Sequence, residues 1–173
     1  MSIHIIIDGY NLIRQSSELS RLDQQDIQLG REALIDILAM YKKIKRHRIT
    51  IVFDGAMAPR NSQRQDRQKG ILIIFSKNNE SADSVIKKIA RSERERVLIV
   101  SSDRAVIRSA ASFGSATISA DDFEKKLIMA RHADDVEIGI DDSKGWKPTT
   151  KKKGPSRRPS RRQRRNRRKI RKL

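Results

Sequence analysis

The sequence predicts an α/β fold with a mainly parallel, five-stranded sheet flanked by helices. Short apolar runs rich in Ile and Val alternate with longer segments whose apolar residues recur at helical spacing. Such β-branched runs are typical of strands buried on both faces, and strands that alternate with helices are usually parallel. The chain has 173 residues, which is enough for one domain of this kind with a sizeable core.

The predicted elements follow the chain in a regular order. The segment 56–70 is polar and basic and contains Pro59 and Gly70, so we expect a loop there. The predicted strands are residues 3–7, 49–53, 71–75, 97–100 and 116–118. The predicted helices span about 28–46, 82–92, 103–113 and 119–131.

Charge divides the chain into a nearly balanced body and a basic tail. The net charge is +18, but residues 147–173 hold 15 Lys or Arg and no acid, which leaves about +3 for the remainder. With few aliphatic and no aromatic residues, the tail is expected to be disordered in isolation, or helical from about Arg161 onward against a polyanion. We therefore predict a folded domain at 1–131, a linker at 132–146 and a basic tail at 147–173.

The composition of the tail favours nucleic acid over a membrane as its partner. A membrane-binding helix needs an apolar face, whereas a phosphate backbone needs only positive charge. A solubilising or localising tail stays an alternative. The sequence has no cysteine, no apolar run of membrane-spanning length and no signal-peptide pattern, so we expect a cytoplasmic protein.

Four aspartates lie where predicted strands end or where the next helix begins. Asp8 and Asp54 directly follow strands, Asp103 follows a strand after two serines, and Asp83 begins the helix after the third strand. Because parallel strands end at one edge of a sheet, we expect these carboxylates to gather on one rim. Each alone is explained equally well as a helix cap or turn. Four together would repel one another unless a cation lies among them, and hard carboxylate oxygens suit Mg²⁺ or Mn²⁺.

The motifs around these aspartates resemble those of the YacP-like endoribonucleases, in the NYN branch of the PIN-like nucleases. The resemblance rests on IIIDGYN (5–11), IVFDG (51–55), ESADSVIKKI (80–89) and VSSDRAV (100–106), and it covers roughly residues 3–131. It implies a three-layer PIN-like (NYN) fold and an acidic, metal-dependent site that hydrolyses RNA.

The resemblance also implies roles for five residues. Asp8, Asp83 and Asp103 match the family's metal-binding acids, and Asn11 matches the polar residue that positions the first acid or the substrate. Asp54 matches the second-strand aspartate. We expect Mg²⁺ or Mn²⁺ at this site to activate water and to polarise the phosphoryl group. Asn11 could instead do no more than close a turn.

The resemblance also implies a function, because the family includes members that act on messenger RNA in association with the ribosome. We therefore expect a metal-dependent endoribonuclease that acts on messenger RNA or ribosome-associated RNA, with the ribosome itself as a further partner. A non-catalytic RNA- or ribosome-binding protein on the same fold stays open, and so, more weakly, does DNA cleavage by a relative of flap-type nucleases. The sequence does not predict an oligomeric state. Basic residues expected to contact the RNA backbone lie in the 56–70 loop, where simple solvation is an equal alternative, and in the tail. They are Arg60, Arg64, Arg67, Lys69, Arg157, Arg158, Arg161, Arg162, Arg164 and Arg165.

Overall fold

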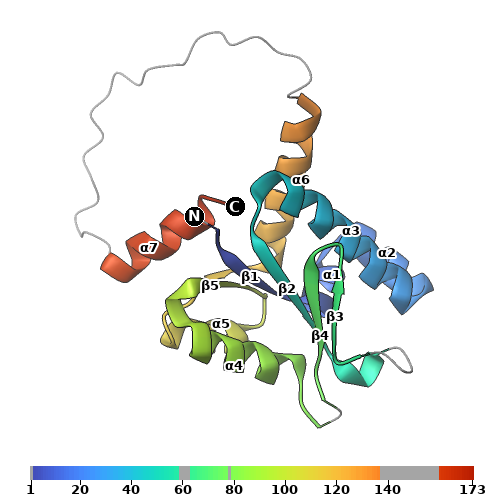
Figure 1. Cartoon of the computed structure of the whole chain (residues 1–173), viewed down its shortest axis with the longest axis horizontal. Helices are drawn as coiled ribbons and strands as arrows, with labels where there is room; N and C mark the ends of the chain where they lie inside the picture. The colour runs from blue at the N-terminus through green and yellow to red at the C-terminus, as the bar shows by residue number, and fades with distance from the viewer. Residues whose placement is uncertain (1, 59–62, 78, 137–159) are drawn as a thin grey trace.

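A computed structural model of the chain contains a sheet between two groups of helices (Figure 1). The structure describes residues 2–58, 63–77, 79–136 and 160–173. Within these ranges the sheet has six strands in the order β3-β4-β2-β1-β5-β6, all parallel to their neighbours except β3 and β4. The strands are β1 (His4–Asp8), β2 (Arg48–Phe53), β3 (Gln65–Gln68), β4 (Ile71–Phe75), β5 (Val97–Val100) and β6 (Ala116–Ile118).

The helices form two layers and one addition at the end of the sheet. One layer covers the sheet with α1, α2, α3 and α6, and the other with α4 and α5, while α7 lies beside the two chain termini (Figure 1). No helix among the described residues is long and apolar enough to cross a bilayer. The helices are α1 (Gly9–Gln15), α2 (Ser17–Gln25), α3 (Ile27–Lys45), α4 (Ala82–Glu93), α5 (Arg104–Ser112), α6 (Ala120–Val136) and α7 (Arg161–Ile170), with single 3-10 turns η1 (Gly55–Met57) and η2 (Arg94–Arg96).

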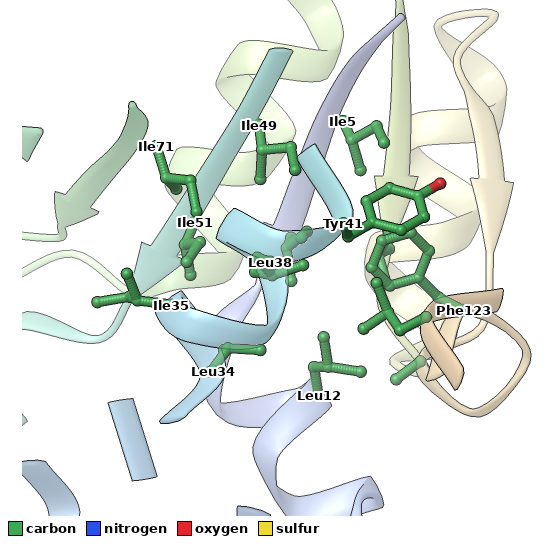
Figure 2. Packing of buried hydrophobic residues seen from close by; sticks show 14 of the residues in the cluster. Ile5, Leu12, Leu34, Ile35, Leu38, Tyr41, Ile49, Ile51, Ile71 and Phe123 are labelled. Carbon is green, nitrogen blue, oxygen red and sulfur yellow. The ribbon is translucent and has the colours of Figure 1, made fainter. Parts of the chain in front are cut away.

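The central strands are buried on both faces, as their β-branched composition predicts. Successive side chains alternate between two cores, so that Ile5 packs on the α3 side and Ile6 packs with α4 and α5. Leu38 of α3 lies over Ile49 and Ile51 of β2 (Figure 2). Each of these side chains is almost fully buried and stabilises the fold by roughly 1.5–3 kcal/mol. This packing fixes the register of the strands and therefore the place where each one ends.

The predicted fold class is confirmed, and the strand count is corrected from five to six. The segment 56–70, predicted as a loop, contains η1 and the edge strand β3, which pairs antiparallel with β4. Lys69 and Gly70 join the two strands with φ angles of 49° and 78°. Positive φ at both positions is typical of a two-residue type I′ hairpin turn. β3 was not predicted because its residues, QDRQ, are polar and mostly exposed and show no alternation of apolar and polar side chains.

Two helices before α3 were not predicted. The short α1 begins directly after Asp8, and α2 begins after Ser16, whose hydroxyl accepts the N–H of Leu19. With seven residues α1 is too short to display a clear helical period, and α2 has only two apolar residues, Leu19 and Leu22. The other predicted helices occur within a few residues of their expected bounds, although α6 extends to Val136 instead of ending near residue 131.

The tail helix α7 begins at the predicted residue but packs against the body. Leu173 is buried and Ile170 is partly buried against the main core, and the hydroxyl of Tyr41 donates to the carbonyl of Leu173 at 3.0 Å. The expectation of a tail that stays unfolded without a polyanion is therefore not met for residues 160–173. Two aliphatic residues suffice because the body supplies the rest of the apolar surface. The domain divisions at 131 and 146 stay predictions, since 137–159 lie outside the described residues.

Candidate active site at the carboxyl edge of the sheet

Asp8 is the most buried of the four predicted aspartates. It ends β1 and caps α1, where its Oδ1 accepts the N–H of Asn11 at 3.3 Å and its Oδ2 accepts the hydroxyl of Ser101 at 3.1 Å. Burial raises the pKa of Asp8 to about 6, the two hydrogen bonds oppose this shift, and the charges of Asp83 and Asp103 add to it. A cation beside this carboxylate would favour its ionised form.

Asn11 connects the junction of β1 and α1, which carries Asp8, to the loop after β5, which carries Asp103. Its Oδ1 accepts the backbone N–H of Ser102 at 2.8 Å, in the loop after β5. In the same loop, Ser101 donates to Asp8 and accepts the N–H of Asp103 at 3.1 Å. The Asn11 side chain therefore bridges neighbouring strand ends, which is more than closing the turn after β1.

Asp103 caps α5 and remains ionised. Its Oδ1 accepts the N–H groups of Ala105 at 2.6 Å and Val106 at 3.0 Å, and these hydrogen bonds lower its pKa. The capping alternative is thus correct, but it uses only one carboxylate oxygen. The hydrogen bonds of the described residues leave Oδ2 available for a ligand.

Asp83 and Asp54 lie within electrostatic range of this network. Asp83 stands in the first turn of α4, where burial raises its pKa, the charges of Asp103 and Asp54 add to that shift, and Lys87 at 3.9 Å opposes it. Asp54 is partly exposed and caps η1 by accepting the N–H of Ala56 at 3.0 Å. Asp54 therefore forms the turn that the sequence allowed, whether or not it also takes part in the site.

The carboxyl edge thus brings Asp8, Asn11 and Asp103 into one hydrogen-bonded network, with Asp83 and Asp54 nearby. Among the described residues, no three Asp, Glu, His or Cys side chains approach closely enough to form a ready-made metal site. Mutual repulsion between the carboxylates opposes such an approach. The donor set still fits Mg²⁺ or Mn²⁺, because it consists of carboxylate oxygens and one member is held in a site that disfavours its negative charge.

Sequence reasoning missed a serine and two glycines that build this edge. Ser101 is fully buried between two of the aspartates. A Cβ on Gly9 would lie 2.3 Å from the ring of Phe53, and one on Gly55 would lie 1.9 Å from the carbonyl oxygen of Ser76. Both glycines directly follow a predicted site aspartate. The repeated Asp-Gly pair was the available signal that backbone passes closely there.

The basic residues predicted to bind RNA are dispersed over the molecule. Arg64 and Arg67 are exposed in and beside β3, whereas Lys69 forms an ion pair with Asp36. Arg60, Arg157 and Arg158 lie outside the described residues. No contact of the described part of the chain tests whether any of these side chains meets RNA.

The basic helix α7 lies at the opposite end of the sheet from the aspartates (Figure 1). Lys169 donates to the carbonyl of Val97 at the start of β5, whereas Asp103 follows the end of that strand. Arg165 is held by Glu95 through contacts of 2.5 and 2.6 Å. Arg161 and Arg164 are exposed residues of the helix, which also contains Arg162.

Comparison with known proteins identifies a family and related proteins. The model of the YacP-like NYN domain matches residues 5–172, a range that includes α7. The uncharacterized protein YacP of Bacillus subtilis is 31% identical over 87 residues, which are 50% of this chain and 51% of that protein, so the alignment spans about half of this relative. The crystal structure of Rae1 (YacP) from Bacillus subtilis is 24% identical with a TM-score of 0.66 over 80% of each chain. A crystal structure of a mutant of Rae1 is also 24% identical, with a TM-score of 0.62 over 76% of this chain and 78% of the mutant chain. At this identity the two structures support the fold.

Proposed function

The chain belongs to the YacP-like NYN domain family, and from that premise we propose that it is a metal-dependent endoribonuclease. The family is one of PIN-like nuclease domains, which supports a nuclease with RNA as its substrate. Divalent-metal dependence is our proposal, and the observation that carries it is the environment of Asp8. This buried carboxylate lies near two further carboxylates at the strand ends, and a protein that only binds RNA would have little reason to present such an edge to a polyanion.

Asp8, Asp83 and Asp103 are the proposed metal ligands. A bound Mg²⁺ or Mn²⁺ would supply an activated water and a Lewis acid for the phosphoryl oxygens. Ser101 holds one oxygen of Asp8 toward the loop after β5, and Asn11 ties the junction of β1 and α1 to the same loop. These contacts keep the carboxylates in place without adding charge, which is the usual role of residues that support metal ligands.

The proposed setting is messenger RNA at the ribosome, in the cytoplasm. Its support is the motif resemblance to a family with ribosome-associated members, together with the basic helix α7. A ribosome offers extended phosphate surface, so a basic surface distant from the acidic edge could anchor the protein while the edge reaches the substrate.

Incubation of the purified protein with labelled single-stranded RNA and with DNA of the same sequence tests the proposal. We expect cleavage of RNA with Mn²⁺ or Mg²⁺, none with EDTA and little of DNA. Glu18→Gln, which neutralises an exposed acid in the first turn of α2, is the control and should cleave normally. RNA binding without cleavage under all metal conditions would instead favour the non-catalytic binding protein.

A further inference from the structure

A hollow of about 340 Å³ opens beside the acidic edge, on the side of the sheet that α3 covers. Its walls come from the first turns of α3, the ends of β2 and β4, and the edge strand β3. Phe53 in this wall directly precedes Asp54, so the hollow adjoins the candidate active site. Its size lies at the lower end of the roughly 300–1,000 Å³ that is common for small-molecule pockets.

Arg31 at the wall of the hollow is buried but incompletely bonded. It is 4% exposed. One of its terminal nitrogens, Nη1, donates to the carbonyl of Met57 at 2.9 Å, and its guanidinium carbon lies 5.8 Å from the centre of the Phe75 ring. Its Nε is buried and has no hydrogen-bond partner among the described residues. A buried charged donor without an acceptor is rare in native proteins unless a ligand or an ordered water completes it.

Two further unpaired groups lie near this arginine. The hydroxyl of Tyr10 and Oδ1 of Asp23 are buried without a partner, and with Arg31 they make up three of the four such side chains in the described part of the chain. The charges of Arg31, Asp23 and Asp54 all act on the pKa of Tyr10, so these groups are neighbours. Incompletely bonded polar atoms are therefore concentrated around Arg31, which is the one of these three residues that lines the hollow.

We propose that the hollow is a subsite for one unstacked nucleobase of single-stranded RNA beside the scissile bond, with the guanidinium of Arg31 in its wall donating to an acceptor on the base. This inference rests on the proposed function and extends it to substrate recognition. The hollow combines apolar walls, including Phe75, with the polar side chains of Gln28 and Gln68, a composition that suits a base edge. The carboxylate of Asp66, which also lines it, disfavours a phosphate there.

The first test combines an abasic substrate with a variant that fills the hollow. Replacing single bases by abasic sites around the cut should reveal one position at which cleavage by the wild type falls about tenfold or more, the scale of losing one base contact. Gln68→Trp should cleave intact RNA as poorly as the wild type cleaves that abasic RNA, with no further loss on the abasic substrate. Gln65→Trp is the matched control and should behave as the wild type. Side chains alternate between the two faces of a strand, so Gln65, three residues from Gln68, lies on the face away from the hollow.

The second test addresses Arg31 directly. Arg31→Lys keeps the charge but removes the planar guanidinium, and it should reduce discrimination among the four bases at the sensitive position while cleavage of the best substrate persists. If this variant does not fold, Gln28→Trp fills the hollow from α3 and leaves Arg31 in place. Unchanged base preference in Gln68→Trp and the folded Arg31 or Gln28 variant would overturn the subsite and assign the unpaired atoms to ordered water.

Failure of the subsite and failure of the proposed function give different results. Cleavage with unaltered base preference would contradict only the subsite. Absence of cleavage in the wild type would contradict the proposed function, and equilibrium binding of the same intact and abasic oligonucleotides would still decide the subsite. In the binding measurement, a loss of affinity for abasic RNA in the wild type alone supports the subsite. An equal loss in the wild type and in Gln68→Trp would overturn the subsite.

Discussion

The carboxyl and amino edges of the sheet differ in how their acidic side chains are partnered. At the carboxyl edge, burial and the charges of Asp83 and Asp103 raise the pKa of Asp8, and burial and the charge of Asp103 raise that of Asp83. At the amino edge, the carboxylate of Glu95 pairs with Arg165, and that of Glu93 lies 2.8 Å from the ring of His4, whose pKa is lowered by burial. Paired charges are consistent with a structural role, whereas uncompensated charges that weaken the fold are typical of a functional site.

The largest effect is expected from neutralising one carboxylate at the carboxyl edge. Asp103→Asn retains the side-chain shape and one capping acceptor but removes a proposed metal ligand, so RNA cleavage should fall by roughly 10³-fold or more. Circular dichroism should show an intact fold. Cleavage by folded Asp103→Asn at the wild-type rate would exclude a catalytic role for this edge.

At the amino edge, the largest expected effect is on stability and not on activity. Leu173→Ala removes a buried anchor of α7 and should lower the free energy of unfolding by about 2–3 kcal/mol. Arg171→Ala, an exposed neighbour, should change it by less than about 0.5 kcal/mol. Chemical denaturation measures both, and equal stability of the two variants would mean that α7 does not anchor the fold.

Asn11→Ala distinguishes a bridge between loops from a turn-closing residue. Loss of the contact to Ser102 should let the loop after β5 move away from the junction of β1 and α1. Activity per folded molecule should fall about 10–100-fold, as for residues that support metal ligands. Activity is to be measured beside the unfolding midpoint. A lower midpoint with normal turnover would leave Asn11 a purely structural role.

Asp8 should make stability depend on pH in the absence of metal. Its folded-state pKa of about 6 exceeds the ordinary value of 3.8, so the folded state binds the proton more tightly and stability falls as pH rises between these values. Asp8→Asn should lack this fall and be more stable than the wild type at pH 8 in EDTA, by about 1–3 kcal/mol. Mg²⁺ or Mn²⁺ should then stabilise only the wild type, whereas a parallel pH dependence in both proteins would contradict the assignment.

The smallest expected effect concerns RNA binding by α7. Replacing Arg161 and Arg164 by Gln should weaken RNA binding regardless of sequence and flatten the plot of log K against log salt by roughly 0.7–0.9 for each lost phosphate contact. Arg165→Gln is the comparison, because this side chain is held by Glu95 and its loss should affect stability more than the slope. Titrations at several salt concentrations separate the two results.

The carboxyl edge was predictable from sequence to a degree that the amino edge was not. Each aspartate of the edge follows a strand that is recognisable locally or, as Asp83 does, begins the helix after one, and the carboxyl ends of parallel strands lie at one edge of the sheet. Docking of α7 depends on Leu173 meeting Tyr41, which is 132 residues away in sequence, and no local pattern reports such a contact. The bridging role of Ser101 was hidden for a related reason, since a serine after a strand is common in loops and its two partners lie on separate segments.

The antiparallel hairpin at the other margin of the sheet has a consequence for solubility. The residues of β4, ILIIF, form an apolar and strongly β-prone strand, which as an open edge would be a template for pairing with other chains. The polar β3 covers that edge, and the tight turn at Lys69 and Gly70 keeps it in register. Cleavage or loosening of this turn is therefore expected to cause aggregation before it affects the arrangement of the aspartates.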